Sequence, residues 1–257
     1  MKRECEVNNV CVIILTKNEE KNIVGAVQNA WLVADEVLIV DSGSTDKTCE
    51  EARKNGAEVV YRQWDNDFAA QRNFGLTQTD AEWVLYLDAD ERMNEKLAAA
   101  VKKVIAEGKD AQYSFMRKSV AFGKEFSYGV LHPDRVLRLF RRTSVHWVNK
   151  VHERPVCSLP SCKLDGYAMH YTYENWQQYY QKFNQYTTIW AENAFSKGKR
   201  TGYLSAFAHG LFAFIQTAFL KKGLLDGFPG LVLSLNHSFY TLVKYVKLIE
   251  LQRISKE

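Results

Sequence analysis

Cysteine is scarce in this chain of 257 residues and shows no structural arrangement. The five cysteines (Cys5, Cys11, Cys49, Cys157 and Cys162) are an odd number without a Cys-x-x-Cys pair. Neither a disulfide framework nor a zinc site is therefore indicated. We expect reduced thiols, most of them buried.

The amino terminus lacks the apolar core of a signal peptide. Residues 1 to 9 are polar and charged, and the apolar run that follows extends only from Val10 to Leu15, which is far too short. Low-complexity tracts and internal repeats are also missing,. We therefore expect an ordered chain that stays in the cytoplasm, with one large α/β domain or one such domain with an appendage.

Acidic residues are few near the carboxyl end. From Lys197 onward nine basic residues accompany three acidic ones, a net charge of +6. The whole chain carries +4, so residues 1 to 196 carry −2. Because the basic residues bracket apolar runs, we expect an anionic membrane leaflet rather than nucleic acid as the partner. Solvated helix ends are the alternative.

Strand and helix patterns alternate through the first hundred residues. Apolar runs typical of buried strands occupy 10–15, 36–40, 58–61 and 83–87, and helical patterns occupy 19–31, 46–55, 68–76 and 94–105,. Asn94 is the expected N-cap of the last helix, and Gly108 ends it. This alternation predicts a mostly parallel sheet flanked by helices and joined by right-handed crossovers.

The pattern changes after residue 108. Strands are predicted at 112–117, 135–140 and 164–170, separated by long polar loops, which favours an antiparallel addition to the sheet,. A helix with a broad aromatic face is predicted over 174–196. Two apolar runs follow, at 203–220 and 228–246, and both carry polar residues in mid-run,. We expect a helical hairpin that lies in one leaflet; helices packed on the domain and true spanning helices are the alternatives.

Three carboxylates follow the strand at 83–87, namely Asp88, Asp90 and Glu91. Carboxyl ends of parallel strands border the crevice where open α/β sheets bind ligands. Closely spaced Asp oxygens suit a hard divalent cation that is shared with substrate phosphates, and two such acids repel unless a cation lies between them. The cluster therefore predicts a metal-assisted site for a nucleotide-linked substrate. Glu91 receives no separate role.

Three other polar sets lie beyond strand ends: 16–19, 41–46 and 71–73. Strand carboxyl ends share one edge of a parallel sheet, so these sets are expected to converge with the acidic cluster. Each set has a structural alternative when taken singly. The set at 41–46, for example, contains Asx-turn and Ser/Thr-turn residues near a helix N-terminus.

Four segments (12–20, 40–46, 69–75 and 87–91), in this order and at these intervals, resemble the family 2 glycosyltransferases of the GT-A fold. The resemblance covers roughly the first hundred residues. It implies an α/β, GT-A (nucleotide-diphospho-sugar transferase) catalytic domain over residues 1–172, with a nucleotide-sugar half to about 108 and an acceptor half over 109–172. Residues 173–257 form the expected helical, membrane-associating region. A divalent ion, Mg²⁺ or Mn²⁺, is the implied cofactor.

The same resemblance implies roles for individual residues. Asp88 reaches the ribose, Asp90 ligates the metal, and Arg72 faces the diphosphate. His170 is implied as a late second ligand of that metal, although taken alone it would be a structural residue. The residues implied to hold the nucleoside are Thr16, Asn18, Glu20 and Asp41.

Inversion at the sugar requires a general base on the face opposite the leaving group. Many relatives carry a His-Glu pair where other GT-A enzymes have their catalytic acid, and here His152 precedes Glu153. The resemblance therefore assigns Glu153 as the base and His152 as the neighbour that orients it, with a surface ion pair as the alternative. Arg135 and Arg138, beside an apolar strand, are expected to reach phosphates of donor or acceptor.

Residues 16–20, 151–153 and 223–230 together are similar to bacterial β-1,4-glucosyltransferases of the lipopolysaccharide inner core. This similarity implies UDP-glucose as donor, a heptose on a lipid A-linked acceptor, and action at the inner face of the cytoplasmic membrane. The alternatives are a polyprenyl-phosphate or other polysaccharide acceptor, a sugar nucleotidyltransferase, and a non-catalytic nucleotide-binding membrane protein. A nucleotidyltransferase would normally carry a Gly-rich loop after the first strand, and residues 16–20 contain no glycine.

Overall fold

The computed structural model describes residues 9–150 and 153–255. The chain divides into two compact units. The first, here called the sheet unit, comprises the chain up to Arg117 together with Asp134–His170. The second, here called the helical unit, comprises Lys118–Pro133 and the chain from Tyr171 onward.

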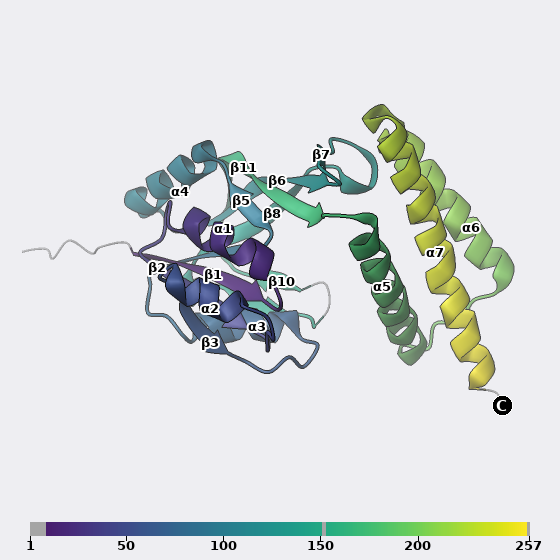
Figure 1. The fold of residues 1–257 in the computed structure, drawn as a ribbon, viewed down its shortest axis with the longest axis horizontal. Helices are drawn as coiled ribbons and strands as arrows, with labels where there is room; N and C mark the ends of the chain where they lie inside the picture. The colour runs from purple at the N-terminus through teal and green to yellow at the C-terminus, as the bar shows by residue number, and fades with distance from the viewer. Residues whose placement is uncertain (1–8, 151–152, 256–257) are drawn as a thin grey trace, which may run out of the picture. The chain divides into compact units, whose positions relative to one another are not determined.

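The first four strands of the sheet are parallel, as predicted, in the order β3-β2-β1-β4. These strands are β1 (Val10–Thr16), β2 (Glu36–Asp41), β3 (Glu58–Tyr61) and β4 (Trp83–Asp88). Strands β1, β2 and β3 are labelled in Figure 1. The helices that alternate with them are α1 (Glu20–Ala30), α2 (Thr48–Lys54), α3 (Phe68–Leu76) and α4 (Glu95–Glu107). The predicted strands and helices of this part are all confirmed, with α2 beginning two residues later than expected.

Local chemistry fixes the ends of two of these helices. Asn94 caps α4 by accepting a hydrogen bond from the Leu97 N–H at 2.9 Å, and Gly108 ends that helix with a φ of 64°. Asp67 caps α3 by accepting from the Ala70 N–H at 2.9 Å. Side-chain caps of this kind satisfy amide groups that have no partner within the helix.

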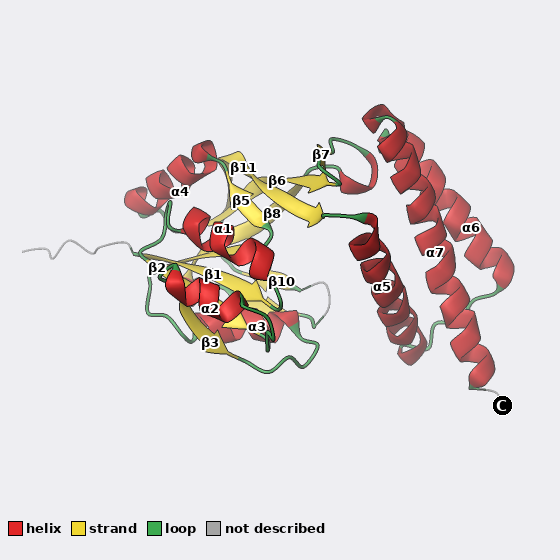
Figure 2. Cartoon of the chain, viewed as in Figure 1, coloured by secondary structure: helices red, strands yellow, loops and turns green. Residues whose placement is uncertain are grey.

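The rest of the sheet is the predicted antiparallel addition (Figure 2). Strand β8 (Asp134–Arg141) pairs with β4 and with β6 (Gln112–Ala121), followed by β11 (Ser161–Tyr173) and β5 (Glu91–Met93). The two-residue strand β7 (Lys124–Glu125) pairs with β6, and β9 (His146–Val148) pairs with β10 (Arg154–Val156) as a separate ribbon. Strands β6 and β11 each extend beyond their predicted ends, at 117 and 170.

The sheet unit is packed on both faces of its parallel strands. Val12 and Ile14 of β1 belong to the core under α1, α2 and α4, whereas Ile13 belongs to the core under α3 and β9. Burial on both faces explains why these strands are continuous apolar runs rather than alternating ones. Among the described residues, the cysteines at 11, 49, 157 and 162 carry free thiols, and Cys11 is buried.

The helical unit consists mainly of α5 (Trp176–Ser196), α6 (Tyr203–Ile215) and α7 (Phe228–Ile254). A π-helical turn, η3 (Gln216–Leu220), continues α6, and the short helix η4 (Gly223–Asp226) precedes α7. Within the described residues, Tyr203–Leu220 is the one helix long and apolar enough to cross a membrane by length and composition, with a mean hydropathy of 1.4.

Segment 118–133 belongs to the helical unit, whereas the predicted boundary at 172 placed it with the catalytic domain. Its short helix η1 (Gly129–Leu131) contacts α7, and Phe126 and Leu131 share a core with Tyr179 and Leu233. The carboxylate of Asp226 also accepts the N–H groups of Ser127 and Tyr128. This packing could not be predicted from sequence order, because strands β8 to β11 separate segment 118–133 from the helices it packs against.

Candidate active site

Strand register brings three of the predicted polar sets together. In the parallel pairing, Thr16 lies opposite Asp41, and Leu15 lies opposite Asp88. The carboxyl ends of β1, β2 and β4 therefore meet at one edge of the sheet, which is the convergence expected from the alternating pattern.

The loops after β1 and β2 are tied to each other by reciprocal hydrogen bonds. Asn18, which has a φ of 56°, donates its N–H to Ser44 Oγ at 2.8 Å and accepts the Thr45 N–H on Oδ1 at 2.8 Å. Glu20 accepts the Lys47 N–H at 3.2 Å. Both residues are exposed beyond these contacts, so their remaining oxygens and the adjoining backbone form one polar surface.

Asp41 is only 3% exposed and orders its own loop. Its carboxylate accepts the N–H groups of Gly43 and Ser44 at 2.8 and 2.9 Å, and also the Ser44 hydroxyl. Gly43 has a φ of 95°, a conformation that costs glycine little,. Asp41 therefore fixes the shape of the loop after β2. The Thr16 hydroxyl beside it is a buried polar group without a partner among the described residues.

Arg72 of α3 connects two carboxylates that lie far apart in the sequence. Its Nη2 lies 3.1 Å from Asp88 Oδ1 and 3.2 Å from Glu153 Oε1. The guanidinium also lies over the rings of Trp147 and Tyr86, 4.7 and 5.3 Å from their centroids. Its Nη1 is buried without a partner among the described residues. Arg72 is therefore held rigidly by aromatic packing and has one donor group left unused.

Asp88 is held by a second arginine. Arg138 of β8 donates from Nη2 to Asp88 Oδ2 at 2.8 Å, and its side chain is buried. Burial acts to raise the pKa of Asp88, but the charges of Arg138, Arg72 and Arg117 outweigh it and hold the pKa well below its usual range. Asp88 is therefore ionised at neutral pH. Arg138, which was expected to reach phosphates, pairs with this carboxylate.

Glu91 contacts both Asp88 and Arg138, and no role in the site was predicted for it from the sequence. It is fully buried; its Oε2 accepts the Asp88 N–H at 3.2 Å, and its Oε1 lies 3.3 Å from Arg117 Nη1 and 3.8 Å from Arg138 Nη2. Burial and the charge of Asp88 raise the pKa of Glu91, opposed by the two arginines. Arg117 also pairs with Asp134 at 2.8 Å. The sequence signal was an acidic residue at the start of the short strand β5.

The pairing of β5 with β11 brings the late histidine to the acidic turn. His170 lies opposite Glu91 in that ladder, and its Nε2 lies 3.3 Å from Asp90 Oδ2. Burial lowers the pKa of His170, but the hydrogen bond and charge of Asp90 and the charge of Glu91 outweigh it, so the pKa is raised. The two residues expected to share a metal are thus neighbours, although 80 positions separate them.

The remaining expected residues have different outcomes. Glu153 joins the cluster through Arg72, whereas His152 lies outside the described residues. Arg135 is exposed on β8 and donates to the Ser114 carbonyl at 3.1 Å. Its described contacts therefore do not include the carboxylate cluster.

A metal at this edge would take few protein ligands. The described residues contain no group of three or more His, Cys, Asp or Glu side chains placed to hold one. Asp90 and His170 offer one carboxylate and one imidazole. Mg²⁺ is commonly held by one or two carboxylates together with substrate phosphates, so a pair of protein ligands fits an ion that is completed by a diphosphate.

Comparisons with known proteins identify the family of this chain. The family model described as glycosyl transferase family 2 matches residues 11–222. An uncharacterized glycosyltransferase of Rickettsia typhi is 26% identical, the alignment covering 97% of this chain and 90% of the relative. The lipopolysaccharide core biosynthesis glycosyltransferase LpsC of Rhizobium meliloti is 24% identical, with 92% and 90% covered.

Solved structures give a partial match. Glucosyl-3-phosphoglycerate synthase from Mycobacterium tuberculosis, in complex with Mn²⁺, UDP and glucosyl-3-phosphoglycerate, is 21% identical with a TM-score of 0.40. The match covers 53% of this chain and 58% of that one.

The chain belongs to glycosyl transferase family 2. It is therefore a glycosyltransferase with a GT-A-like sheet, and the family resemblance inferred from the four motifs is confirmed.

Proposed function

We propose that this glycosyltransferase is an inverting, metal-dependent enzyme that transfers glucose from UDP-glucose to a heptose of a lipid A-linked acceptor by single displacement. The observation that carries the proposal is Arg72, which joins Asp88 at the donor edge to Glu153. The likeness to LpsC over most of both chains supports an acceptor of the lipopolysaccharide core. A polyprenyl-phosphate or other polysaccharide acceptor is the second candidate within the same class.

The donor occupies the edge where β1, β2 and β4 end. The nucleoside is held by the two joined loops, which carry Asn18 and Glu20. The Thr16 hydroxyl and the loop ordered by Asp41 complete this part of the site. Asp88, kept ionised by its two arginines, accepts hydrogen bonds from ribose hydroxyls. The positive charge of Arg72 lies at the same edge, beside Asp88, and attracts the diphosphate.

Asp90 and His170 would hold the divalent ion, Mg²⁺ or Mn²⁺, at this edge. When bound, such an ion stabilises negative charge on the departing diphosphate as a Lewis acid. Arg72 adds fixed positive charge on the same side, and its packing against Trp147 keeps it from reorganising during the reaction,.

Glu153 is the proposed base that takes the proton from the acceptor hydroxyl. Its Oε1 is held by Arg72 at 3.2 Å, which fixes the direction of the carboxylate. His152, proposed as its orienting neighbour, lies outside the described residues. A base within hydrogen-bond reach of the acceptor proton contributes roughly 10²–10⁴-fold to rate.

A donor-hydrolysis screen tests the donor and the metal. Purified enzyme is incubated with UDP-, GDP- and TDP-sugars, each with EDTA, Mg²⁺ or Mn²⁺. We expect release of UDP from UDP-glucose only when a divalent ion is present. Equal turnover in EDTA contradicts the metal assignment, and preference for another nucleotide contradicts the donor assignment. Lipid A-linked saccharide and polyprenyl phosphate are then compared as acceptors.

We also propose that the exposed apolar face of α6 binds an anionic bilayer at the cytoplasmic side of the membrane. Leu204, Phe207 and Leu211 follow helical spacing and are 84%, 62% and 51% exposed. Basic residues lie at both ends of this helix, at 197, 199 and 200 before it and at 221 and 222 after it. An apolar stripe between cationic ends fits insertion into a leaflet with acidic headgroups.

Vesicle flotation tests this surface. We expect the protein to float with vesicles that contain anionic phosphatidylglycerol and to float less with neutral phosphatidylcholine vesicles. Leu204→Glu should abolish flotation, whereas Leu32→Glu, at an exposed apolar position of the sheet unit, should leave it unchanged. Equal flotation of both variants contradicts the proposal.

A further inference from the structure

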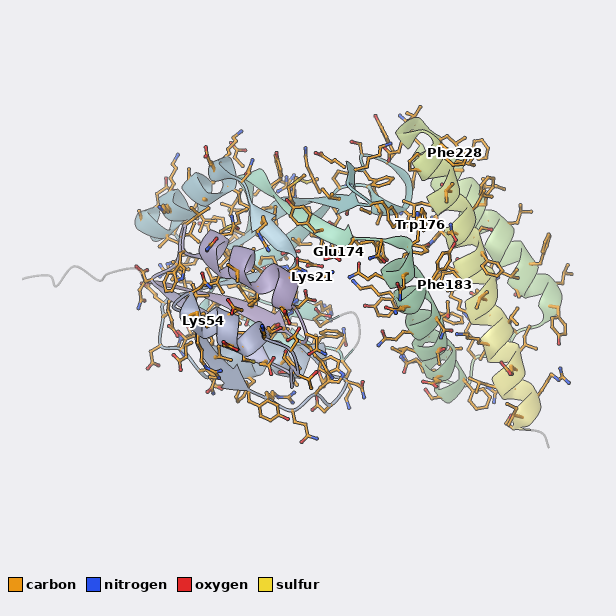
Figure 3. The ribbon with its side chains drawn as sticks, in the orientation of Figure 1. Lys21, Lys54, Glu174, Trp176, Phe183 and Phe228 are labelled. Carbon is orange, nitrogen blue, oxygen red and sulfur yellow. The ribbon has the colours of Figure 1, made fainter. Side chains whose placement is uncertain are left out.

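The helical unit contains a cavity of about 240 Å³ with a mostly aromatic wall. It is lined by side chains of α5, α7, η1 and the end of β11, among them Tyr173, Tyr179, Phe183, Tyr186, His237 and Tyr240. Phe183, labelled in Figure 3, extends from α5 toward α7, where its ring centroid lies 5.4 Å from that of Tyr240. All of the lining residues belong to the helical unit, so the cavity is complete within one compact body.

Several polar groups of this wall have no protein partner. The hydroxyls of Tyr173, Tyr179 and Tyr240 and the imidazole of His237 form no hydrogen bond with any residue that the structure describes. Burial, followed by the neighbouring Tyr186 and Tyr240, raises the pKa of Tyr173 to about 12, so its hydroxyl is protonated at neutral pH. Burial and two lysines lower the pKa of His237 to about 4. A neutral imidazole offers one donor and one acceptor.

Two lysines flank the cavity. Lys182 Nζ lies 5.4 Å from the ring centroid of Tyr173, and Lys244 Nζ lies 5.6 Å from that of Tyr240. Within the described part of the chain neither ammonium forms an ion pair, and no Asp or Glu lines the cavity. Burial and the charge of Lys199 lower the pKa of Lys244, whose ammonium also lies 4.9 Å from the ring centroid of Trp190. The surroundings of the cavity therefore favour a negatively charged ligand.

This combination suits a sugar better than an acyl chain. Aromatic faces pack against the apolar face of a pyranose ring, and tyrosine and histidine supply hydrogen bonds to its hydroxyls. An acyl chain would leave these buried polar groups unpaired, which is unfavourable. The volume is below the roughly 300–1,000 Å³ of sites for drug-sized ligands, so one ring fits rather than an oligosaccharide.

We propose that this cavity binds one anionic sugar residue, carrying a carboxylate or a phosphate, of the saccharide acceptor. The assignment to the acceptor rests on the proposed function, because a lipid-linked core saccharide is the substrate that would bring such a residue to the enzyme. Tyr173 and Tyr240 form its walls, and Lys182 and Lys244 provide the charge. The cavity thus becomes a recognition subsite within the helical unit.

Saturation-transfer NMR on the full-length protein tests binding. The probes are glucuronate, glucose 6-phosphate, methyl β-glucoside, inorganic phosphate and decanoate, each with excess UDP to occupy the nucleotide site. We expect transfer to the ring protons of glucuronate, of glucose 6-phosphate or of both, which identifies the acidic group. Methyl β-glucoside should bind at least about tenfold more weakly, the scale of one lost charge-assisted hydrogen bond.

Matched variants locate the binding. Lys244→Met should weaken the anionic probe about tenfold, and Tyr240→Ala should abolish its signal. Lys197→Met, which removes the same charge from an exposed position at the end of α5, should leave binding unchanged. Thermal melting of each variant shows whether it is folded, and Tyr240→Phe, which keeps the ring but loses the hydroxyl, supplements Tyr240→Ala if that variant melts early.

Three outcomes overturn the proposal. The first is that no sugar receives saturation transfer, and the second is that methyl β-glucoside binds as tightly as the anionic sugars. The third is that decanoate displaces the sugar at a concentration below that of the sugar itself. Donor hydrolysis is measured on the same preparations. Active donor turnover without sugar binding contradicts the subsite alone, whereas sugar binding without any turnover contradicts the proposed function.

Discussion

Removing the buried carboxylate of Glu91 should destabilise the sheet unit far more than removing an exposed one. In Glu91→Ala, Arg117 and Arg138 lose a common partner, and the Asp88 N–H loses its acceptor. Breaking a buried pair by removing one partner costs about 3–5 kcal/mol. Arg117 keeps Asp134 and Arg138 keeps Asp88, so we expect the lower end of this range, about 3 kcal/mol.

Glu91→Gln separates charge from hydrogen bonding. The amide keeps the size of the side chain and one oxygen acceptor, so the Asp88 N–H can still be satisfied. The amide nitrogen then faces a guanidinium and offers it no acceptor. We expect a loss of about 1–2 kcal/mol for this variant, on the scale of one buried group left unsatisfied.

Urea unfolding followed by tryptophan fluorescence measures both changes. Four of the six tryptophans, Trp31, Trp64, Trp83 and Trp147, lie in the sheet unit and report on it. The control is Glu107→Ala, whose exposed side chain lies 3.9 Å from Lys103 and should change stability by less than about 0.5 kcal/mol. A loss below about 1 kcal/mol in Glu91→Ala would refute the reasoning, because it would mean that the two arginines do not depend on this carboxylate.

The other predictions concern chemistry and pH. Asp90→Ala should abolish metal-dependent release of UDP while the melting temperature is kept; full activity would remove Asp90 from the metal site. Glu153→Gln should leave UDP affinity nearly unchanged and cut transfer by at least ~100-fold; a marginal loss would place the base elsewhere. The pKa of His237 is about 4 in the folded chain and about 6.5 in the unfolded chain. Between these two pH values the unfolded chain binds more protons, so the free energy of unfolding falls as the pH decreases. Between pH 7 and 5.5 the loss should be about 1 kcal/mol and should be absent in His237→Gln, as measured by urea midpoints; identical midpoint shifts in both proteins would show that His237 does not cause it.

The fold of the sheet unit was accessible from sequence because its signals are local. Apolar runs such as Val10–Leu15, the cap residue Asn94 and the stop at Gly108 each act within a few residues. The convergence of Asp41 and Asp88 also followed, since the register of parallel strands requires only their order.

What the sequence did not reveal depends on contacts between distant residues. Glu91 could not be given a role because its partners Arg117 and Arg138 come from β6 and β8. The pairing of Arg138 with Asp88 was not predicted either, since nothing local in the sequence shows that the two residues meet. The meeting of His170 with Asp90 was obtained from family resemblance, and its physical cause, the ladder between β11 and β5, lies in a pairing that no local pattern encodes.

The two-piece construction of the helical unit limits how the protein can be divided. A cut at residue 172 removes α5 to α7 but leaves Phe126 and Leu131 behind, without Tyr179 and Leu233 to cover them. Strands β6 and β11 both continue from one unit into the other. The helices are therefore not a detachable tail: grafting them onto another transferase would require the loop 118–133 as well. We therefore expect the protein to tolerate insertions and recombination only where segment 118–133 and the helices from Tyr171 onward are kept together.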